Sequence, residues 1–257
     1  TISLLQSFKP TIEFEDLTYN FVTDFEKFLY ESGYQTNTVA KHMKHLKSFV
    51  NAAINKGYID PNNYAFRRYK IKMKEGKHVF LLPEEMKRLE EVSLTGRNSC
   101  LEHTLDAFLF CCYTGLRYSD FVNLNEKNIV KMDGKLWLIF DSVKTGTEVK
   151  LPLNLLFEGK ALTLLQKYQG KWSSFFLIKN NSSVNKELIR IGKLAKISKH
   201  FSFHSARHTN ATLLIYKGAN ITTVQKLLGH KNLATTQIYG EVMGSTIIRD
   251  LKKCQKR

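Results

Sequence analysis

A strongly basic stretch divides this chain, and it is the feature that most limits the folds open to it. Residues 67–77 read RRYKIKMKEGK, whereas residues 1–60 hold six basic and seven acidic side chains. A run of like charges favours an extended, solvated segment over a packed core. The sequence therefore predicts two folded parts, 1–66 and 81–257, joined by a basic linker at 67–80.

Hydrophobic side chains before the linker recur at helical spacing. FVTDFEKFLYESG, starting at Phe21, stops at Gly33, and TVAKHMKHLKSFVNAAINKG, starting at Thr38, stops at Gly57. Such stripes are typical of amphipathic helices that pack a small bundle. The apolar positions that we expect to share the core are Phe21, Phe25, Phe28, Leu29, Val39, Met43, Leu46, Phe49, Val50 and Ala53.

The second part begins and ends with helical patterns that flank two strand-like runs. A helix start is indicated at 82–92, and a buried helix is indicated by LEHTLDAFLFCCYT, which ends at Gly115. KLWLIF and TEVKLPL, within 135–153, are typical of strands on either side of a turn. Helical patterns then return up to 229. We therefore expect a mainly α fold with a small antiparallel β-sheet, in which a helical bundle precedes a mixed α+β domain.

Composition narrows the class of protein. The net charge is +16 and 43% of residues are hydrophobic, which excludes a disordered chain. The longest uncharged apolar stretch, 107–113, is too short to span a membrane, and no signal peptide opens the chain. Four cysteines without CxxC spacing favour free thiols in a reducing cytoplasm. Because the first residue is Thr1 rather than Met, we expect a fragment of a longer chain.

The excess of clustered basic residues favours nucleic acid as the partner. One basic face lies on the predicted helix at 38–57, one follows the linker, and one lies on the helical pattern at 185–197; an ordinary solvated surface is the alternative for each. The DNA-contact candidates are Lys41, Lys44, Lys47, Arg67, Arg68, Lys70, Lys72, Lys74, Lys186, Arg190 and Lys193.

Four short stretches of the second part are rich in polar residues that a core would not select. They are TGLRYSD at 114–120, VKTG at 143–146, HSARH at 204–208, and LGHKNLATTQIYG at 228–240. Together they supply cations, proton donors and a candidate nucleophile, without a carboxylate pair. A metal-dependent nuclease would need clustered carboxylates, which are missing.

This residue set suits chemistry at a phosphodiester. The guanidiniums of Arg117 and Arg207 can hold the charge that grows on the non-bridging oxygens. Lys144, in a turn, can protonate the leaving alkoxide. The phenol of Tyr239 can attack phosphorus when cations surround it. His204, three residues before Arg207 at a helix start, shares a face with that arginine and can grip a phosphate oxygen.

A metal site is the rival interpretation of HSARH. His204 and His208 are four residues apart and could share an ion on one helical face. The stretch lacks the Glu of HExxH, Arg207 would lie beside the cation, and no third ligand is evident. We therefore expect neither a metal nor a cofactor.

The order TGLR, VKTG, HSARH, LGH and a tyrosine nine residues later resembles the tyrosine recombinases, the phage-integrase superfamily. By this resemblance the catalytic residues are Arg117, Lys144, His204, Arg207, His230 and Tyr239, and Asp120 supports them. Residues 57–62, the linker and LLPEEMKRL also resemble the core-binding domain and junction of Bacteroides-type mobile-element integrases. Many integrases of that group carry a further N-terminal arm-binding domain.

The resemblance implies a site-specific recombinase that integrates or excises a mobile element. It would cut duplex DNA through a 3′-phosphotyrosyl bond, free a 5′-hydroxyl and rejoin the strands without metal or ATP. Its two domains would clamp DNA, and four copies would assemble on two sites. The C-terminal pattern at 243–257 predicts a helix that is apolar on one face. That helix could belong to the core of its own domain, and the resemblance favours docking into a neighbour. Accessory DNA-bending proteins are a further partner class, and we expect the protein in the bacterial cytoplasm on the nucleoid.

Two other functions remain open. A type IB topoisomerase-like enzyme would share the phosphotyrosine chemistry but relax supercoils as a monomer. A non-catalytic DNA-binding or architectural protein would need the basic charge alone. The presence of Tyr239 together with the arginines, the lysine and the histidines of the other motifs favours an enzyme.

Overall fold

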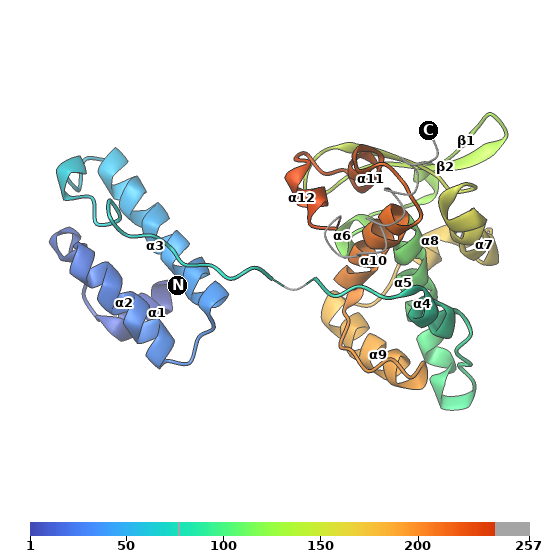
Figure 1. The fold of residues 1–257 in the computed structure, drawn as a ribbon, viewed down its shortest axis with the longest axis horizontal. Helices are drawn as coiled ribbons and strands as arrows, with labels where there is room; N and C mark the ends of the chain where they lie inside the picture. Colours follow the sequence, from blue (N-terminus) through green and yellow to red (C-terminus); the bar gives the residue numbers. More distant parts are fainter. Residues whose placement is uncertain (77, 240–257) are drawn as a thin grey trace, which may run out of the picture. The chain divides into compact units, whose positions relative to one another are not determined.

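A computed structural model describes residues 1–76 and 78–239 (Figure 1). The chain divides into two compact units, Thr1–Lys77 and His78–Arg257, which we call unit 1 and unit 2. Within the described residues, no helix combines the length and apolar character that crossing a membrane requires. The predicted C-terminal helix at 243–257 lies outside the described residues.

Unit 1 is a small helical bundle made of α1 (Ile2–Phe8), α2 (Tyr19–Glu31) and α3 (Thr36–Asn55). The hydroxyl of Thr18 caps α2 by accepting a hydrogen bond from the backbone N–H of Phe21. Most of the expected apolar positions are buried, but Phe49 is 45% exposed, so its assignment to the core was wrong. Val50, the next residue, faces inward in its place, because a helix has room for only one of two consecutive side chains on a narrow core face.

The first half of the predicted linker lies against unit 1. Tyr69 and Ile71 pack against the core of the bundle. The Asn37 side chain donates to the backbone carbonyl of Lys74 and accepts from its N–H, both at 2.9 Å. Residues 70–76 have no regular secondary structure. The basic segment is thus extended yet fixed to α3 as far as Lys74, and the predicted domain limits remain a proposal.

Unit 2 is built around α5 (Glu102–Thr114), which is buried at every residue from Thr104 to Thr114. It contacts α10 (Phe203–Tyr216), among others, in a core rich in phenylalanine. Rings such as those of Phe110 and Phe175, whose centroids are 5.4 Å apart, meet edge to face. The remaining helices are α4 (Pro83–Glu90), α6 (Tyr118–Phe121), α7 (Lys160–Lys167), α8 (Trp172–Phe176), α9 (Asn181–Leu194), α11 (Ile221–Leu228) and α12 (Ala234–Gln237).

A three-stranded antiparallel sheet of order β1-β2-β3 completes unit 2. Its strands are β1 (Ile129–Met132), β2 (Lys135–Asp141) and β3 (Glu148–Pro152). Leu138 faces Leu151 across the last pair, and both side chains are buried. The sequence patterns predicted the last two strands but not β1, because four residues are too few to give a periodic signal. The predicted fold class, mainly α with a small antiparallel sheet, is confirmed.

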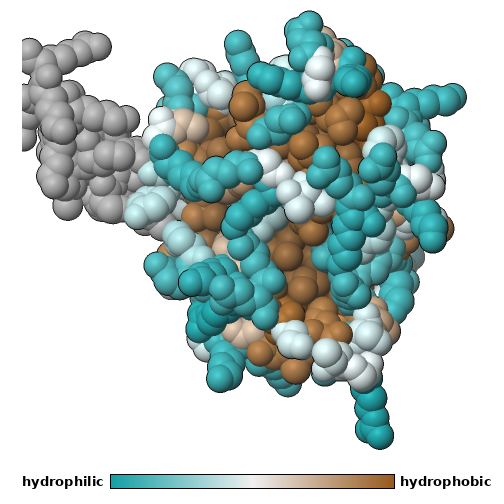
Figure 2. Space-filling model, turned by 90° about the vertical axis from the view of Figure 1, so that its right-hand side faces the viewer, coloured by the Kyte–Doolittle hydropathy of each residue, from teal (hydrophilic) through white to brown (hydrophobic). Residues whose placement is uncertain are grey.

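One face of unit 2, over α4, α5 and α7, carries hydrophobic surface between hydrophilic side chains (Figure 2). Two cavities lie in this region, of about 430 and about 420 Å³. Glu90, Tyr113 and Lys160 line both cavities. The Tyr113 hydroxyl and the Lys160 ammonium each donate a hydrogen bond to the Glu90 carboxylate. None of the predicted catalytic residues lines either cavity, so this face is separate from the site described next.

Candidate active site

Arg117 begins the site at the start of α6. The short loop after α5 reverses at Gly115, whose φ of +74° is left-handed and favours glycine. A Cβ there would lie 2.6 Å from Leu228 Cδ2, so glycine also allows the loop to approach α11 closely. These constraints place Arg117 between the end of α5 and the sheet.

A carboxylate and a hydroxyl orient Arg117. Its Nη1 donates to Ser142 Oγ at 2.9 Å and to the buried Asp120 carboxylate at 3.4 Å. Asp120 also accepts a hydrogen bond from the backbone N–H of Val143 at 2.9 Å. Asp120 therefore ties α6 to the β2–β3 turn and gives Arg117 a fixed direction.

Arg207 is held by two backbone carbonyls. It is 2% exposed, and its Nη1 and Nη2 donate to the backbone carbonyls of Gly115 at 2.8 Å and Leu228 at 2.5 Å. Both carbonyls lie at helix C-termini, where the peptide dipoles favour a cation. Burial, and then the charge of Arg117, lower the pKa of Arg207 from its usual value. The guanidinium keeps further N–H groups for an anion.

Lys144 lies in the β2–β3 turn and is exposed. The turn is joined to the loop after α11, because Thr145 Oγ1 donates to the Gly229 carbonyl at 3.3 Å. The charge of Lys144 contributes to lowering the pKa of both His204 and His230, so the lysine belongs to the same electrostatic neighbourhood.

His230 follows Gly229, which has a left-handed φ of +63°. Its Nδ1 lies 2.8 Å from Thr236 Oγ1. Burial, followed by the charges of Arg207, Arg117 and Lys144, lowers the pKa of His230 to about 3. The ring is therefore neutral at physiological pH, and the Thr236 contact leaves its Nε2 for another partner.

His204 is in the first turn of α10 and is exposed. Desolvation, then the charges of Arg207 and Arg117, lowers the pKa of this histidine. The side chain is thus a solvent-accessible member of a cationic group, placed where a helix N-terminus adds positive potential.

Tyr239 is brought into this cationic group from the end of the described chain. It lies two residues beyond α12, and it is 5% exposed. Burial raises the pKa of the phenol, while the charges of Arg207 and Arg117 act in the opposite direction. The phenol therefore lies within electrostatic reach of both guanidiniums.

The structure thus gathers the predicted catalytic residues, from distant parts of unit 2, into one neighbourhood. It also adds residues that the sequence interpretation did not place there. Ser142 contacts Arg117, Thr236 contacts His230, and His208 Nδ1 lies 3.0 Å from Tyr239 Oη. His208 had been considered only as a metal ligand with His204. Within the described residues, no group of three or more potential ligands is arranged around a common metal position.

The predicted DNA-contact residues are spread over other surfaces. In unit 1, Lys41 and Lys44 are exposed on α3, Lys47 is half-buried, and the five basic residues from Arg67 to Lys74 are exposed. In unit 2, three cations are exposed on α9, namely Lys186, Arg190 and Lys193. Lys44 Nζ lies 2.9 Å from Met73 Sδ, which joins the α3 lysines to the basic segment.

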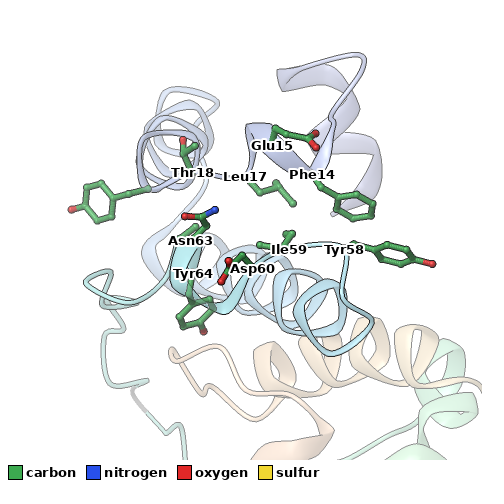
Figure 3. Close-up of a pocket in the computed structure, with 11 residues that line it drawn as sticks. Phe14, Glu15, Leu17, Thr18, Tyr58, Ile59, Asp60, Asn63 and Tyr64 are labelled. Carbon is green, nitrogen blue, oxygen red and sulfur yellow. The ribbon is translucent and has the colours of Figure 1, made fainter.

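Unit 1 also contains a cavity of about 540 Å³ (Figure 3). The rings of Phe14 and Tyr58 stack beside it with centroids 4.9 Å apart. Its lining includes the carboxylates of Glu15 and Asp60 and no basic side chain. Negative charge without a cation would repel a phosphate, so this cavity is not a nucleic-acid site.

Comparison with known proteins matches both units to family models. Residues 79–244 match the phage integrase family, and residues 1–72 match the phage integrase SAM-like domain. The chain belongs to the phage integrase family. It is a tyrosine-type site-specific recombinase. The tyrosine recombinase XerC of Bacillus licheniformis is 30% identical to it over 251 residues, which cover 89% of this chain and 78% of that protein.

Solved structures confirm that this recombinase has the family fold. A lambda integrase (75–356) dimer bound to a COC′ core site superposes with a TM-score of 0.76 at 19% identity, covering 95% of this chain and 86% of that one. A lambda integrase tetramer bound to a Holliday junction gives a TM-score of 0.72 at 19% identity, over 93% of this chain and 69% of that one.

Proposed function

We propose that this recombinase cuts and rejoins duplex DNA at specific sites by using Tyr239 as its nucleophile. The phenol oxygen attacks a backbone phosphorus, a tyrosyl–phosphate bond forms at the 3′ side, and the bond to the 5′ oxygen breaks. Attack by a 5′-hydroxyl from a partner strand reverses the step. The observation that carries this proposal is the burial of the Tyr239 phenol within the field of Arg207 and Arg117.

Each remaining residue then has a role that its surroundings support. Arg117 and Arg207 hold the non-bridging oxygens of the phosphate, because both are fixed before the substrate arrives. Lys144 donates a proton to the leaving 5′ oxygen from its turn. His204 and His230, as neutral rings, donate hydrogen bonds to phosphate oxygens. Asp120 positions Arg117.

DNA binding comes from the exposed cations of both units. The segment 67–74 is extended and basic, and α3 and α9 each present further lysine or arginine side chains. These groups neutralise backbone phosphates and give affinity without sequence preference. The lambda integrase described above forms a tetramer on a Holliday junction, and we propose that four copies of this recombinase act together.

The process that this recombinase serves and its location in the cell are more specific than the reaction itself. Integration or excision of a mobile element stays a prediction, because integrases and XerC recombinases are both among the similar proteins. Participation of accessory DNA-bending proteins also stays a prediction. We propose the bacterial cytoplasm as the location, because that compartment holds the DNA substrate, and Cys111 and Cys112 are free thiols.

Covalent capture tests the proposed function. The enzyme is incubated with a library of nicked duplexes whose core is randomised, and adducts are isolated by denaturing electrophoresis and sequenced. We expect an adduct with the wild type and none with Tyr239→Phe, whereas Tyr216→Phe, a matched change on α10, keeps it. Adduct formation by Tyr239→Phe would refute the proposal. Relaxation of supercoiled DNA without paired sites would favour the topoisomerase alternative.

A further inference from the structure

The phenol of Tyr239 has a polar neighbour to which the proposed chemistry assigns no role. His208 follows Arg207 on α10, and its Nδ1 lies 3.0 Å from Tyr239 Oη. No other side-chain hydrogen bond to this phenol is found within the described residues. Because α10 also carries His204 and Arg207, the contact joins the nucleophile directly to the helix that supplies two other site residues.

The surroundings of His208 determine how the two side chains share a proton. The ring centroid lies 4.7 Å from that of His204, on the same helix, and 4.7 Å from that of His78, which precedes α4. The charges of Arg207 and His230 also act on it. Burial, then the charges of these neighbours, lowers the pKa of His208 to about 3. A neutral ring can accept a hydrogen bond at Nδ1 when its proton resides on Nε2, and the phenol then donates.

Among the described residues, the other neighbours of Tyr239 do not fix its oxygen; the His78 ring lies beside it, with centroids 6.4 Å apart, but makes no hydrogen bond to it. The tyrosine packs with Ala211, Ile215, Val224 and Leu228, which are apolar. Its backbone N–H donates to the Thr236 carbonyl at 3.1 Å. Apolar packing of this kind is not directional, so it holds the ring in place without aiming the hydroxyl. A hydrogen bond is directional and can do so.

We propose that His208 is a positioning residue, whose Nδ1 accepts the phenolic O–H and aims Tyr239 Oη at the space between Arg207 and Arg117. This inference rests on the proposed function. It assigns no proton transfer to His208, because burial and the nearby charge of Arg207 make this ring a poor base. The positioning role requires only a hydrogen-bond acceptor at the position of Nδ1, and another residue type could supply that acceptor.

Two substitutions separate the acceptor from the bulk of the ring. Asn places its amide oxygen near the position of Nδ1, whereas Leu fills similar space without an acceptor. The full chain is used, with single-turnover cleavage measured on a nicked duplex recovered from the capture library. DNA affinity and thermal unfolding are measured alongside. His200→Asn, at an exposed histidine of the same unit, is the matched control.

We expect His208→Leu to cleave about tenfold more slowly, as loss of one aiming hydrogen bond implies, with DNA affinity unchanged. His208→Asn should recover cleavage to within about threefold of the wild type. His200→Asn should match the wild type. Because a structural defect would lower affinity or unfolding temperature and would not be rescued by Asn, this pattern is specific to positioning.

Three results would overturn the inference. Wild-type cleavage by His208→Leu would mean that the contact is dispensable. Faster cleavage would mean that His208 restrains the nucleophile. Equal slowing by Leu and Asn would mean that the imidazole itself is required. In each case the wild type still forms an adduct, so the proposed function stands, whereas absence of any wild-type adduct would refute the function itself.

Discussion

The cations of α3 in unit 1 and those around Arg207 in unit 2 illustrate two different uses of positive charge. Lys41 and Lys44 are exposed, and salt and solvent screen them. Arg207 is buried and held by two backbone carbonyls. A mobile exposed cation adds affinity for any phosphate, whereas a fixed buried cation stabilises charge at one place. Substitutions of the α3 lysines should therefore change binding, and substitutions around Arg207 should change rate.

The largest expected effect is that of Arg207→Lys. Lysine keeps the positive charge but lacks the planar fork of N–H groups. It therefore cannot donate to the carbonyls of Gly115 and Leu228 and also bind a phosphate. Covalent adduct formation should fall by about 10²–10³-fold, as for loss of one pre-organised donor, while DNA affinity changes little. Single-turnover cleavage and a binding titration measure the two quantities. Arg97→Lys, an exposed control, should be unaffected. Equal losses of rate and affinity would remove the distinction between exposed and buried cations.

Asp120→Asn tests whether a buried cation must be oriented as well as present. The amide retains an acceptor for the Val143 N–H but loses the charge that holds Arg117. Cleavage should slow by about 30-fold, between the loss of one hydrogen bond and the loss of a charge clamp. Asp106→Asn is the control, since this buried carboxylate pairs with Lys167 away from the site residues and should alter stability alone. A similar slowing in both variants would argue for a general loss of stability.

Replacing Lys41, Lys44 and Lys47 together by Gln tests the exposed side of the comparison. Affinity should fall by about tenfold, and the slope of log K against log salt should decrease by up to about 3, one for each lost phosphate contact. Cleavage at saturating DNA should stay unchanged. Lys9, Lys27 and Lys56 replaced together remove the same charge from unit 1, and they should change the slope less. Equal slopes would assign the effect to net charge rather than to the α3 face.

The smallest expected effect concerns pH. His208 has a native pKa of about 3, below the unfolded value of about 6.5. Below pH 6.5 the unfolded chain therefore takes up a proton that the native state excludes, so the free energy of unfolding falls as pH falls. From pH 6.5 to pH 5.5 this histidine should contribute a loss of about 1 kcal/mol.

Urea unfolding of the wild type and His208→Asn at both pH values measures that loss. Between the two pH values, His208→Asn should lose about 1 kcal/mol less of its free energy of unfolding than the wild type loses. His200→Asn, at an exposed histidine, should follow the wild type. Identical pH dependence of wild type and His208→Asn would show that His208 titrates as in the unfolded chain.

Local sequence patterns predicted much of the fold because they reflect local physics. The spacing of Phe21, Phe25 and Leu29 predicts one buried helix face, and Gly115 predicts the end of α5. Phe49 was misplaced because periodicity alone cannot choose between adjacent apolar positions at the edge of a face. Strand β1 was missed because it is short, and the attachment of the backbone at Lys74 to α3 depends on Asn37, far away in sequence.

The sequence by itself determined the chemistry available to this recombinase, because two arginines, a lysine, histidines and a tyrosine occur in recognisable short motifs. Only the tertiary structure decided their environment. Burial of Arg207 on two helix ends, the tie from Asp120 to Arg117, and the contact of His208 with Tyr239 all join residues from separate elements. Desolvation and hydrogen-bond direction are properties of packed neighbours, so no linear motif contains them.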